Sequence, residues 1–309
     1  MKRSALIWLV LLGAASSAAA GMESREVSFP SGSHRLPGVL TTPAALEPFA
    51  SVLVIPGSGP VDRDGRSRLA ASLPPTYRLW AERLSEAGLA VLRYDKRSIA
   101  YPALDVPSLD QEDQIADALS AVAYLRSLPQ RAAQRIYVVG HSEGGTLAPL
   151  VAERDGGVAG VAVVNTVQFA VDELVLAQLD ARPELAKSRE EVRRLFAEIA
   201  RGTFPERGLL LGAGARYWSQ WIRYSGEAPA ALLRLPLPVL LVQCLADESL
   251  PGPTLARNVA ELRSIAEGSV ELKELPGLNH FGMVPGAAEP SRELPDALIR
   301  WLKGREGIP

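Results

Sequence analysis

The stretch RIYVVGHSEGG, residues 135–145, decides the fold. An apolar run at 135–139 leads directly into Gly140-His141-Ser142-Glu143-Gly144, and a helical pattern continues to about residue 152. A Gly-x-Ser-x-Gly pattern between a strand and a helix predicts a sharp turn, because the positions two residues either side of the serine must be small for the chain to pack. The turn presents the hydroxyl of Ser142 above the sheet, where the N–H groups and positive dipole end of the next helix also point. The alternative is a glycine-rich turn whose serine has no role.

Apolar runs alternate with amphipathic helical patterns on both sides of this stretch. We therefore expect an α/β fold with a mostly parallel sheet that is covered by helices on both faces. Two short strands at 26–29 and 38–42 are expected before it. The predicted strands are 51–55, 89–94, 135–139, 158–164, 239–242 and 270–275, and the predicted helices include 77–87, 113–127, 254–266 and 294–302.

The alternation stops between about residues 166 and 235. Helical patterns at 171–179 and 190–200 fill this segment, together with four aromatic residues at helical spacing. One α/β domain, 21–309, with a helical cap inserted at about 166–235 fits better than two tandem domains. We expect the aromatic set to be a face that packs the cap on the core rather than a platform for substrate. Its members are Tyr217, Trp218, Trp221 and Tyr224.

Composition narrows the range of functions. The chain has 309 residues, with 33 Lys and Arg against 35 Asp and Glu, so no basic surplus is available for a nucleic acid. The single cysteine, Cys244, excludes an intramolecular disulfide and a cysteine-based zinc site. The sequence holds neither a metal-ligand cluster nor a nucleotide-binding glycine loop, so we expect no metal and no cofactor.

Residues 1–20, MKRSALIWLVLLGAASSAAA, have the layout of a signal peptide. Two basic residues precede a short apolar core, and small residues in an A-x-A arrangement follow it. The alternative is an uncleaved membrane anchor, but the apolar core is shorter than the ~20 residues that span a bilayer. We expect cleavage near residue 20, export to the periplasm or the medium, and no stable membrane insertion of the mature protein.

A serine hydroxyl needs a base, and the chain offers three histidines. His34 lies in the N-terminal turn region, ahead of the predicted parallel sheet. His141 adjoins Ser142, and side chains on successive residues point apart. His280 lies in the loop after the last predicted strand, and loops after parallel strands gather at one sheet edge. Elimination and placement favour His280, against the alternative of a surface histidine.

The base needs an acid that fixes its tautomer. Asp247 and Glu248 follow the predicted strand 239–242, and Asp247 is preferred because it lies nearer the strand end. The chain order Ser142, Asp247, His280 is the order expected for this sheet topology.

An oxyanion hole needs two backbone donors. One is the N–H of Glu143, directly after the nucleophile. The other is expected in Pro56-Gly57-Ser58-Gly59-Pro60, where glycines permit close approach of the backbone. Ser58 N–H is the first choice and Gly59 N–H the second, and the alternative is a tight turn without this role.

These motifs together resemble those of α/β-hydrolases, in particular bacterial esterases of the serine aminopeptidase S33-like group. The resemblance covers about residue 26 to the C-terminus and implies a carboxylic ester hydrolase with a helical cap. Ser98 and Cys244 depart from it, because the family usually has glycine at both places. We expect Cys244 to be a small buried side chain beneath the acid loop rather than a reactive thiol. The matching stretches are PGSGP (56–60), DRDG (62–65), RYDKR (93–97), GHSEGG (140–145), YW (217–218) and LNH (278–280).

The expected function is that of a serine hydrolase acting on a small-molecule ester through a Ser142, Asp247 and His280 triad. A serine aminopeptidase or amidase is the alternative, and an acidic cap residue that captures a substrate amine would favour it. A binding protein that kept the fold without turnover is the third possibility. The charged stretch 62–64 is expected either to line the substrate entrance or to form a charge-paired surface loop.

Overall fold

A computed structural model describes residues 21–44, 50–67, 74–129, 135–287 and 291–306. The signal peptide predicted at 1–20 lies outside the described residues. Among the described helices, none combines the length and the apolar character needed to cross a membrane.

The centre of the structure is an eight-stranded sheet with the order β1-β2-β4-β3-β5-β6-β7-β8. The hairpin β1–β2 is antiparallel, and β2 is antiparallel to β4. All other neighbours are parallel, so the predicted α/β class with a mostly parallel sheet is confirmed. The strands are β1 (Met22–Ser31), β2 (His34–Pro43), β3 (Ala50–Ile55), β4 (Leu89–Tyr94), β5 (Ile136–His141), β6 (Gly160–Val164), β7 (Val239–Cys244) and β8 (Val270–Leu275).

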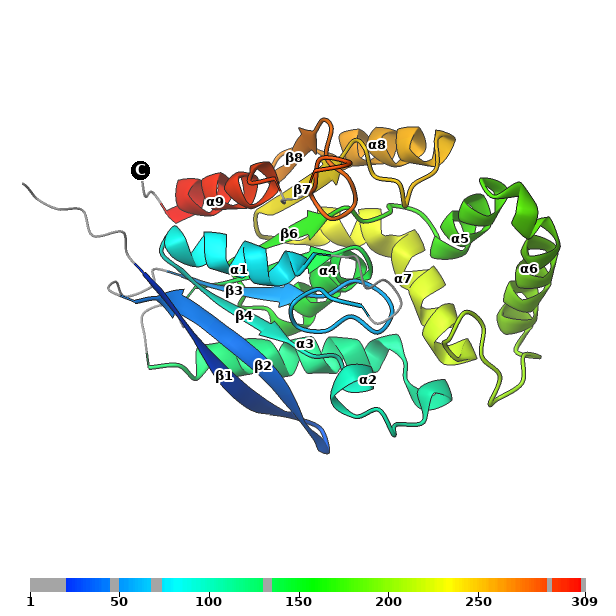
Figure 1. Ribbon diagram of the computed structural model, residues 1–309, viewed down its shortest axis with the longest axis horizontal. Coiled ribbons are helices and arrows are strands. Elements are labelled where there is room, and N and C mark those ends of the chain that lie inside the picture. The colour runs from blue at the N-terminus through cyan, green and yellow to red at the C-terminus, as the bar shows by residue number, and fades with distance from the viewer. Residues whose placement is uncertain (1–20, 45–49, 68–73, 130–134, 288–290, 307–309) are drawn as a thin grey trace, which may run out of the picture.

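Helices cover both faces of this sheet, and Figure 1 shows α1 and α9 side by side on one of them. The opposite face is covered by α3, α4, the second half of α7, and α8. The helices are α1 (Thr76–Glu86), α2 (Arg97–Ala100), α3 (Gln111–Arg126), α4 (Glu143–Asp155), α5 (Val171–Asp180), α6 (Ala186–Arg201), α7 (Ala215–Arg234), α8 (Pro253–Ile265) and α9 (Glu293–Glu306), with short 3-10 turns at Val106–Ser108 and Pro183–Leu185.

The five central strands are buried along their whole length. Every residue of β3, β4, β5, β6 and β7 is buried, as their uninterrupted apolar runs require of strands with helices on both sides. The edge strand β8 instead alternates buried with more exposed positions. The parallel register brings the ends of β3, β5, β6 and β7 to one edge, which is where the loops with the candidate site residues begin.

The turn between β5 and α4 is left-handed at a non-glycine residue. Ser142 has φ 55° and ψ −120°, a backbone conformation that costs free energy unless the surroundings impose it. The surroundings do so here, since a Cβ on Gly140 would overlap the Gly144 carbonyl oxygen. A Cβ on Gly144 would overlap the Ile55 carbonyl oxygen at the end of β3. The two glycines of the pattern are therefore required by the packing of β5, α4 and β3 against one another.

Helices α5, α6 and α7 stand between β6 and β7, in the region where the alternation of strands and helices stops in the sequence. Figure 1 shows α5 and α6 extending beyond the strands, whereas α7 leads back to the sheet domain. The first half of α7 packs with α5 and α6 in a cluster of their own, and its second half joins the main core. The cluster contains Val171, Val192, Phe196, Ile199, Leu210, Trp218 and Trp221.

We expect Gly144→Ala to lower the free energy of unfolding by about 1–3 kcal/mol or more, because the added methyl group cannot fit beside the Ile55 carbonyl. Gly304→Ala is the matched control. Gly304 lies near the end of α9 with open space around its Cβ position, so alanine there should be neutral or stabilising by up to about 1 kcal/mol. Urea unfolding of both variants is the measurement. Equal stability of the two variants would contradict the packing argument.

Candidate active site

Ser142 lines a cavity of about 750 Å³ between the strand ends and the cap helices. His280, Ser58 and Glu143 line the same cavity. The N–H of Ser142 donates to the Val164 carbonyl (2.9 Å), which ties Ser142 to the end of the neighbouring strand β6. Glu143 begins α4, so its N–H is one of the four at a helix start that have no acceptor within the helix.

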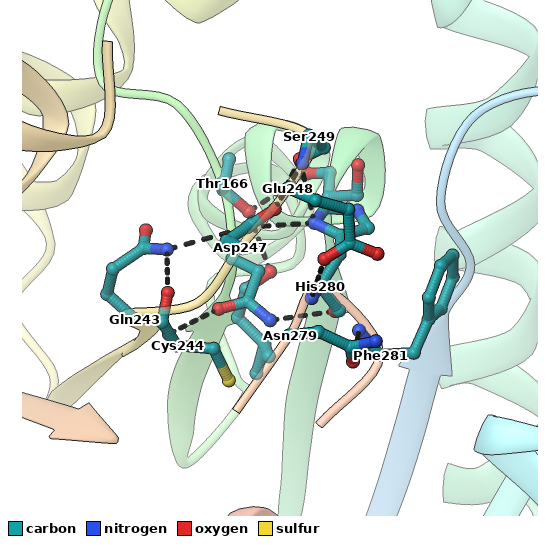
Figure 2. A network of polar contacts seen from close by, with 12 residues as sticks. Thr166, Gln243, Cys244, Asp247, Glu248, Ser249, Asn279, His280 and Phe281 are labelled. Carbon is teal, nitrogen blue, oxygen red and sulfur yellow. Dashed lines mark hydrogen bonds and ion pairs between the residues drawn. The ribbon is translucent and has the colours of Figure 1, made fainter. Parts of the chain in front are cut away.

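His280 and Asp247 form a buried pair beside this cavity. The Nδ1 atom of His280 lies 2.9 Å from Oδ2 of Asp247, and Figure 2 shows the two side chains pointing toward each other. Ser249 supports the pair because its hydroxyl donates to Oδ1 of Asp247 (2.6 Å) and lies 3.0 Å from Nδ1 of His280. The Ser249 N–H donates to the same Oδ1 atom (2.9 Å). Ser249 thus contacts both the carboxylate of Asp247 and the imidazole of His280.

Asp247 stays ionised although it is only 2% exposed. Burial by itself would raise the pKa of its carboxyl group. The charge and hydrogen bond of His280, together with the two donors of Ser249, outweigh burial and hold this pKa below its ordinary value. A charged carboxylate on Nδ1 leaves Nε2 of His280 as the ring atom available to take a proton.

Glu248, the second acid of the loop, has a different place. Its Oε2 atom accepts from the backbone N–H of His280 (3.2 Å), as Figure 2 shows, so it contacts the main chain and not the imidazole. The geometry therefore favours Asp247 as the partner of the ring, as the sequence order predicts.

The other two histidines have no carboxylate on their rings in the described chain. His34 begins β2 and packs on the ring of Tyr101, with centroids 5.0 Å apart. His141 is 1% exposed, and burial lowers its pKa to about 3. Its ring is neutral and bonded to Tyr77 on one side and to the His280 backbone on the other.

The loop after β3 lies directly against Ser142. A Cβ on Gly57 would be 3.2 Å from the Cβ of Ser142, so only glycine leaves the present spacing. The N–H of Gly57 donates to the hydroxyl of Tyr77 (2.8 Å) and is thereby occupied. The next N–H along the chain is that of Ser58, which lines the cavity. Ser58, in the loop after β3, and Glu143, at the start of α4, thus both line the cavity that Ser142 lines.

The carboxylate of Glu143 is buried in a polar cluster beneath the cavity. It accepts from Lys96 (2.8 Å), Gln111 (2.6 Å) and Gln114 (3.0 Å), and it also bonds the hydroxyl of Tyr217 on α7. Burial would raise the pKa of Glu143, but Lys96 and the other donors more than compensate and keep it low. Glu143 is thereby joined to the segment after β4, to α3 and to α7.

The stretch RYDKR, 93–97, supplies cations and an anion to three neighbouring segments. Arg93 pairs with Asp64, and Asp95 accepts from both the backbone and the guanidinium of Arg63. Arg97 pairs with Asp113 and Asp117 on α3. The stretch 62–64 is accordingly a charge-paired loop, and none of its residues is among those that line the cavity in the described structure.

The cap contributes an apolar wall to the cavity. The indole rings of Trp218 and Trp221 stack with centroids 5.5 Å apart, and Trp218 meets Phe196 edge-on at 5.3 Å. Both tryptophans also line the cavity, whereas Tyr224 joins the main core. The expected face between cap and core is thus found for Tyr224 alone, because Trp218 and Trp221 pack within the cap cluster and line the cavity together with Tyr217. The other apolar residues of the segment 166–235 on this wall are Val167, Val171, Leu174, Val175, Leu211 and Ala213.

Each acidic residue on the described cavity wall is paired with a base. Asp110 binds Arg216 (2.5 Å), and Arg97 serves both Asp113 and Asp117. Glu143 is held by Lys96, as described above. Within the described cap, the lining residues include no acid.

Cys244 is fully buried at the end of β7, and burial raises the pKa of its thiol to about 12. Such a thiol is unreactive, so the structure agrees with a packing role beneath the acid loop. Among the residues that the structure describes, no group of three or more His, Cys, Asp or Glu side chains is placed to hold a metal ion.

Sequence reasoning missed several residues that the site brings together. Asn165 and Ser249 bond His280, and Tyr77 bonds Gly57, the residue before Ser58. All three are common residue types in a loop or at a helix start, so no local pattern marks them. The signal for Ser249 was its place two residues after Asp247, where a hydroxyl can bond the preceding carboxylate. Lys96, which bonds Glu143, lies in the charge-rich stretch 93–97 that matches the family motif, but the motif alone does not indicate this partner.

Comparison with known proteins gives concordant matches. A profile of the alpha/beta hydrolase family matches residues 52–294. Esterase EstD of Thermotoga maritima is 32% identical over 212 residues, which are 67% of this chain and 48% of that protein. The chain thus spans about half the length of this curated relative.

Solved structures share the fold at low sequence identity. Est1E from Butyrivibrio proteoclasticus has a TM-score of 0.58 at 17% identity, and the alignment covers 91% of this chain and 99% of that one. Proline iminopeptidase of Mycobacterium smegmatis has a TM-score of 0.59 at 16% identity, covering 91% and 99%. The two likenesses concern the fold alone. With the profile matching most of its length, the chain belongs to the alpha/beta hydrolase family.

Proposed function

We propose that this protein is a serine hydrolase that cleaves carboxylic esters. One observation carries the proposal: Ser142, held in a left-handed elbow, shares a cavity with His280, whose Nδ1 atom is bound by the buried carboxylate of Asp247. The similarity to Esterase EstD supports an ester as the substrate.

In the proposed reaction, Nε2 of His280 takes the proton of Ser142 as the hydroxyl oxygen attacks the ester carbonyl. The carbonyl oxygen becomes an oxyanion that accepts hydrogen bonds from the N–H groups of Ser58 and Glu143. The intermediate then expels the alcohol, which leaves with the proton from His280. Water repeats the sequence on the acyl-enzyme and releases the acid, and Asp247 holds the imidazole tautomer throughout.

The charges on the cavity wall favour esters over amino-acyl substrates. An aminopeptidase needs a carboxylate free to bind the substrate ammonium, because an unpaired charge is costly to bury. The acids on the described wall are engaged by Arg97, Arg216 and Lys96, and the cap offers apolar side chains. An uncharged ester with an apolar acyl or alcohol group fits this wall best.

Removal of the nucleophile should abolish turnover. We expect Ser142→Ala to lower kcat on p-nitrophenyl esters by about 10⁵ to 10⁶-fold, as expected for the loss of a serine nucleophile. Ser58→Ala is the control, since it removes a hydroxyl from the same cavity but keeps the proposed N–H donor, and it should stay within a few-fold of the parent (about 3-fold). Labelling by a fluorophosphonate should disappear only in Ser142→Ala. An unlabelled parent protein would instead indicate a binding protein without turnover.

Substitutions of Asp247 and Glu248 should differ in their effect on kcat. Asp247→Asn presents an amide to Nδ1 of His280 and favours the wrong tautomer, so we expect kcat to fall by about 10³ to 10⁴-fold. Glu248→Gln retains an oxygen for the His280 N–H and should lose less than about 10-fold. A larger loss in Glu248→Gln than in Asp247→Asn would reverse the assignment.

A matched pair of substrates tests whether the cavity wall can bind the ammonium group of an amino-acyl substrate. The p-nitrophenyl esters of propionate and of alanine differ by one ammonium group. We expect kcat/KM to be about 10 to 100-fold higher for the propionate, because no free carboxylate receives the cation. Faster turnover of the alanine ester, or of alanine p-nitroanilide, would favour the aminopeptidase alternative.

A further inference from the structure

A chain of hydrogen bonds passes behind Ser142 and connects the two sides of the site. The Nε2 atom of His141 lies 2.9 Å from the backbone oxygen of His280, and its Nδ1 atom lies 2.9 Å from the hydroxyl of Tyr77. That hydroxyl accepts from the N–H of Gly57 (2.8 Å). The chain starts in the loop with the proposed oxyanion donor and ends on the residue proposed as base.

Chemistry fixes the direction of each bond in this chain. A carbonyl oxygen only accepts, so Nε2 of His141 carries a hydrogen and donates to His280. The ring of His141 is neutral, because burial lowers its pKa to about 3, and Nδ1 is therefore an acceptor. The hydroxyl of Tyr77 must donate to Nδ1, which leaves its oxygen free to accept from Gly57.

The same carbonyl of His280 is held from a second strand. The side-chain amide of Asn165 donates to it (2.8 Å), while the Asn165 Oδ1 atom accepts from the Cys244 N–H (2.8 Å). Asn165 follows β6 and has φ 49°, a conformation that places its side chain under these loops at some cost in backbone energy. The backbone of His280 is thus anchored to the ends of β5, β6 and β7.

The bond from Gly57 to Tyr77 determines how the oxyanion loop can lie. A Cβ on Gly57 would be 3.3 Å from both the Tyr77 hydroxyl and Nδ1 of His141, so the loop is pressed onto this chain. The Gly57 N–H is directed to Tyr77, and the next residue, Ser58, lines the cavity. A loop without this anchor would have to find another acceptor for a buried N–H.

We infer that Tyr77 and His141 are positioning residues that hold the oxyanion loop and the His280 loop in one fixed arrangement around Ser142. The inference rests on the proposed function, since it assigns the two residues to the same reaction. Neither residue needs to touch substrate for this role. A role in packing alone would not require these hydrogen bonds. Apolar side chains could fill the same space without the free-energy cost of burying polar groups that need every partner in place.

Tyr77→Phe removes one oxygen atom and keeps the ring. We expect kcat on a p-nitrophenyl ester to fall by about 10 to 100-fold with KM changed by less than about 3-fold, because the donor is misplaced for the oxyanion and not for the bound ester. Trp80→Phe is the matched control. Trp80 packs edge-on against His141 (5.6 Å, 90°) and against Tyr77 (5.6 Å), outside the hydrogen-bond chain.

Thermal unfolding of both variants distinguishes a positioning role of the Tyr77 hydroxyl from a role in core packing. Trp80→Phe should lower the melting temperature at least as much as Tyr77→Phe and keep kcat within about 3-fold of the parent, since it leaves a larger gap in the core. The inference is overturned if Tyr77→Phe retains the parent kcat, or if the two variants lose kcat in equal measure. If the parent itself cleaves no ester, or if Ser142→Ala is as active as the parent, the proposed function is contradicted as a whole, and not only the role of Tyr77 and His141.

Nitrogen NMR of the three histidines tests the chain without any substrate. His141 should be a single tautomer with hydrogen on Nε2 and should not titrate between about pH 5 and 8. The titratable groups that face it are Tyr77 on α1, and His280 and Asp247 in the loops after β8 and β7. His141→Gln identifies its signals. A His141 that titrates in this range, or that carries hydrogen on Nδ1, would overturn the directed chain.

Discussion

The structure depends on the close approach of three backbones at the β5–α4 turn. There is no room for a Cβ on Gly140 or Gly144, and Ser142 between them is left-handed. The cost of that conformation is offset by the close contact of β5, α4 and β3, whose side chains belong to the main core. The β5–α4 turn is therefore held by the packing of these three elements. The surrounding loops are positioned against this turn.

Charge pairing is the second constraint, because the loops around the elbow are rich in ionisable groups. A buried ion pair contributes little net stability, but a broken one leaves a charge that is expensive to keep from water. The pairs Lys96–Glu143, Arg97–Asp117 and Arg93–Asp64 each join segments distant in sequence. Their main effect is on specificity of structure, since a misplaced loop would leave one of these groups alone in the interior.

The α/β class and the mostly parallel sheet could be predicted from the sequence because apolar runs and a glycine pattern are local signals. The helix α7 was not delimited, because Gly226 and Pro229 interrupt its pattern and tertiary contacts with the core decide its length. Ser142, Asp247 and His280 could be selected by chain order and strand ends. Tyr77 and Asn165 could not, because their bonds to Gly57 and His280 exist only once separate loops are brought together.

The cap leaves the sheet at residues that are themselves bonded to the candidate site. Asn165 donates to the His280 carbonyl, and Thr166 donates to the carbonyl of Ser142 (2.9 Å), so the first two residues after β6 are bonded to two of the candidate site residues. At the other end, α7 bonds Glu143 through Tyr217. Helices α5 and α6 lie between these two fixed ends. Changes in the length or sequence of these two helices would therefore alter the cavity wall that α5 forms and leave the contacts at both fixed ends in place.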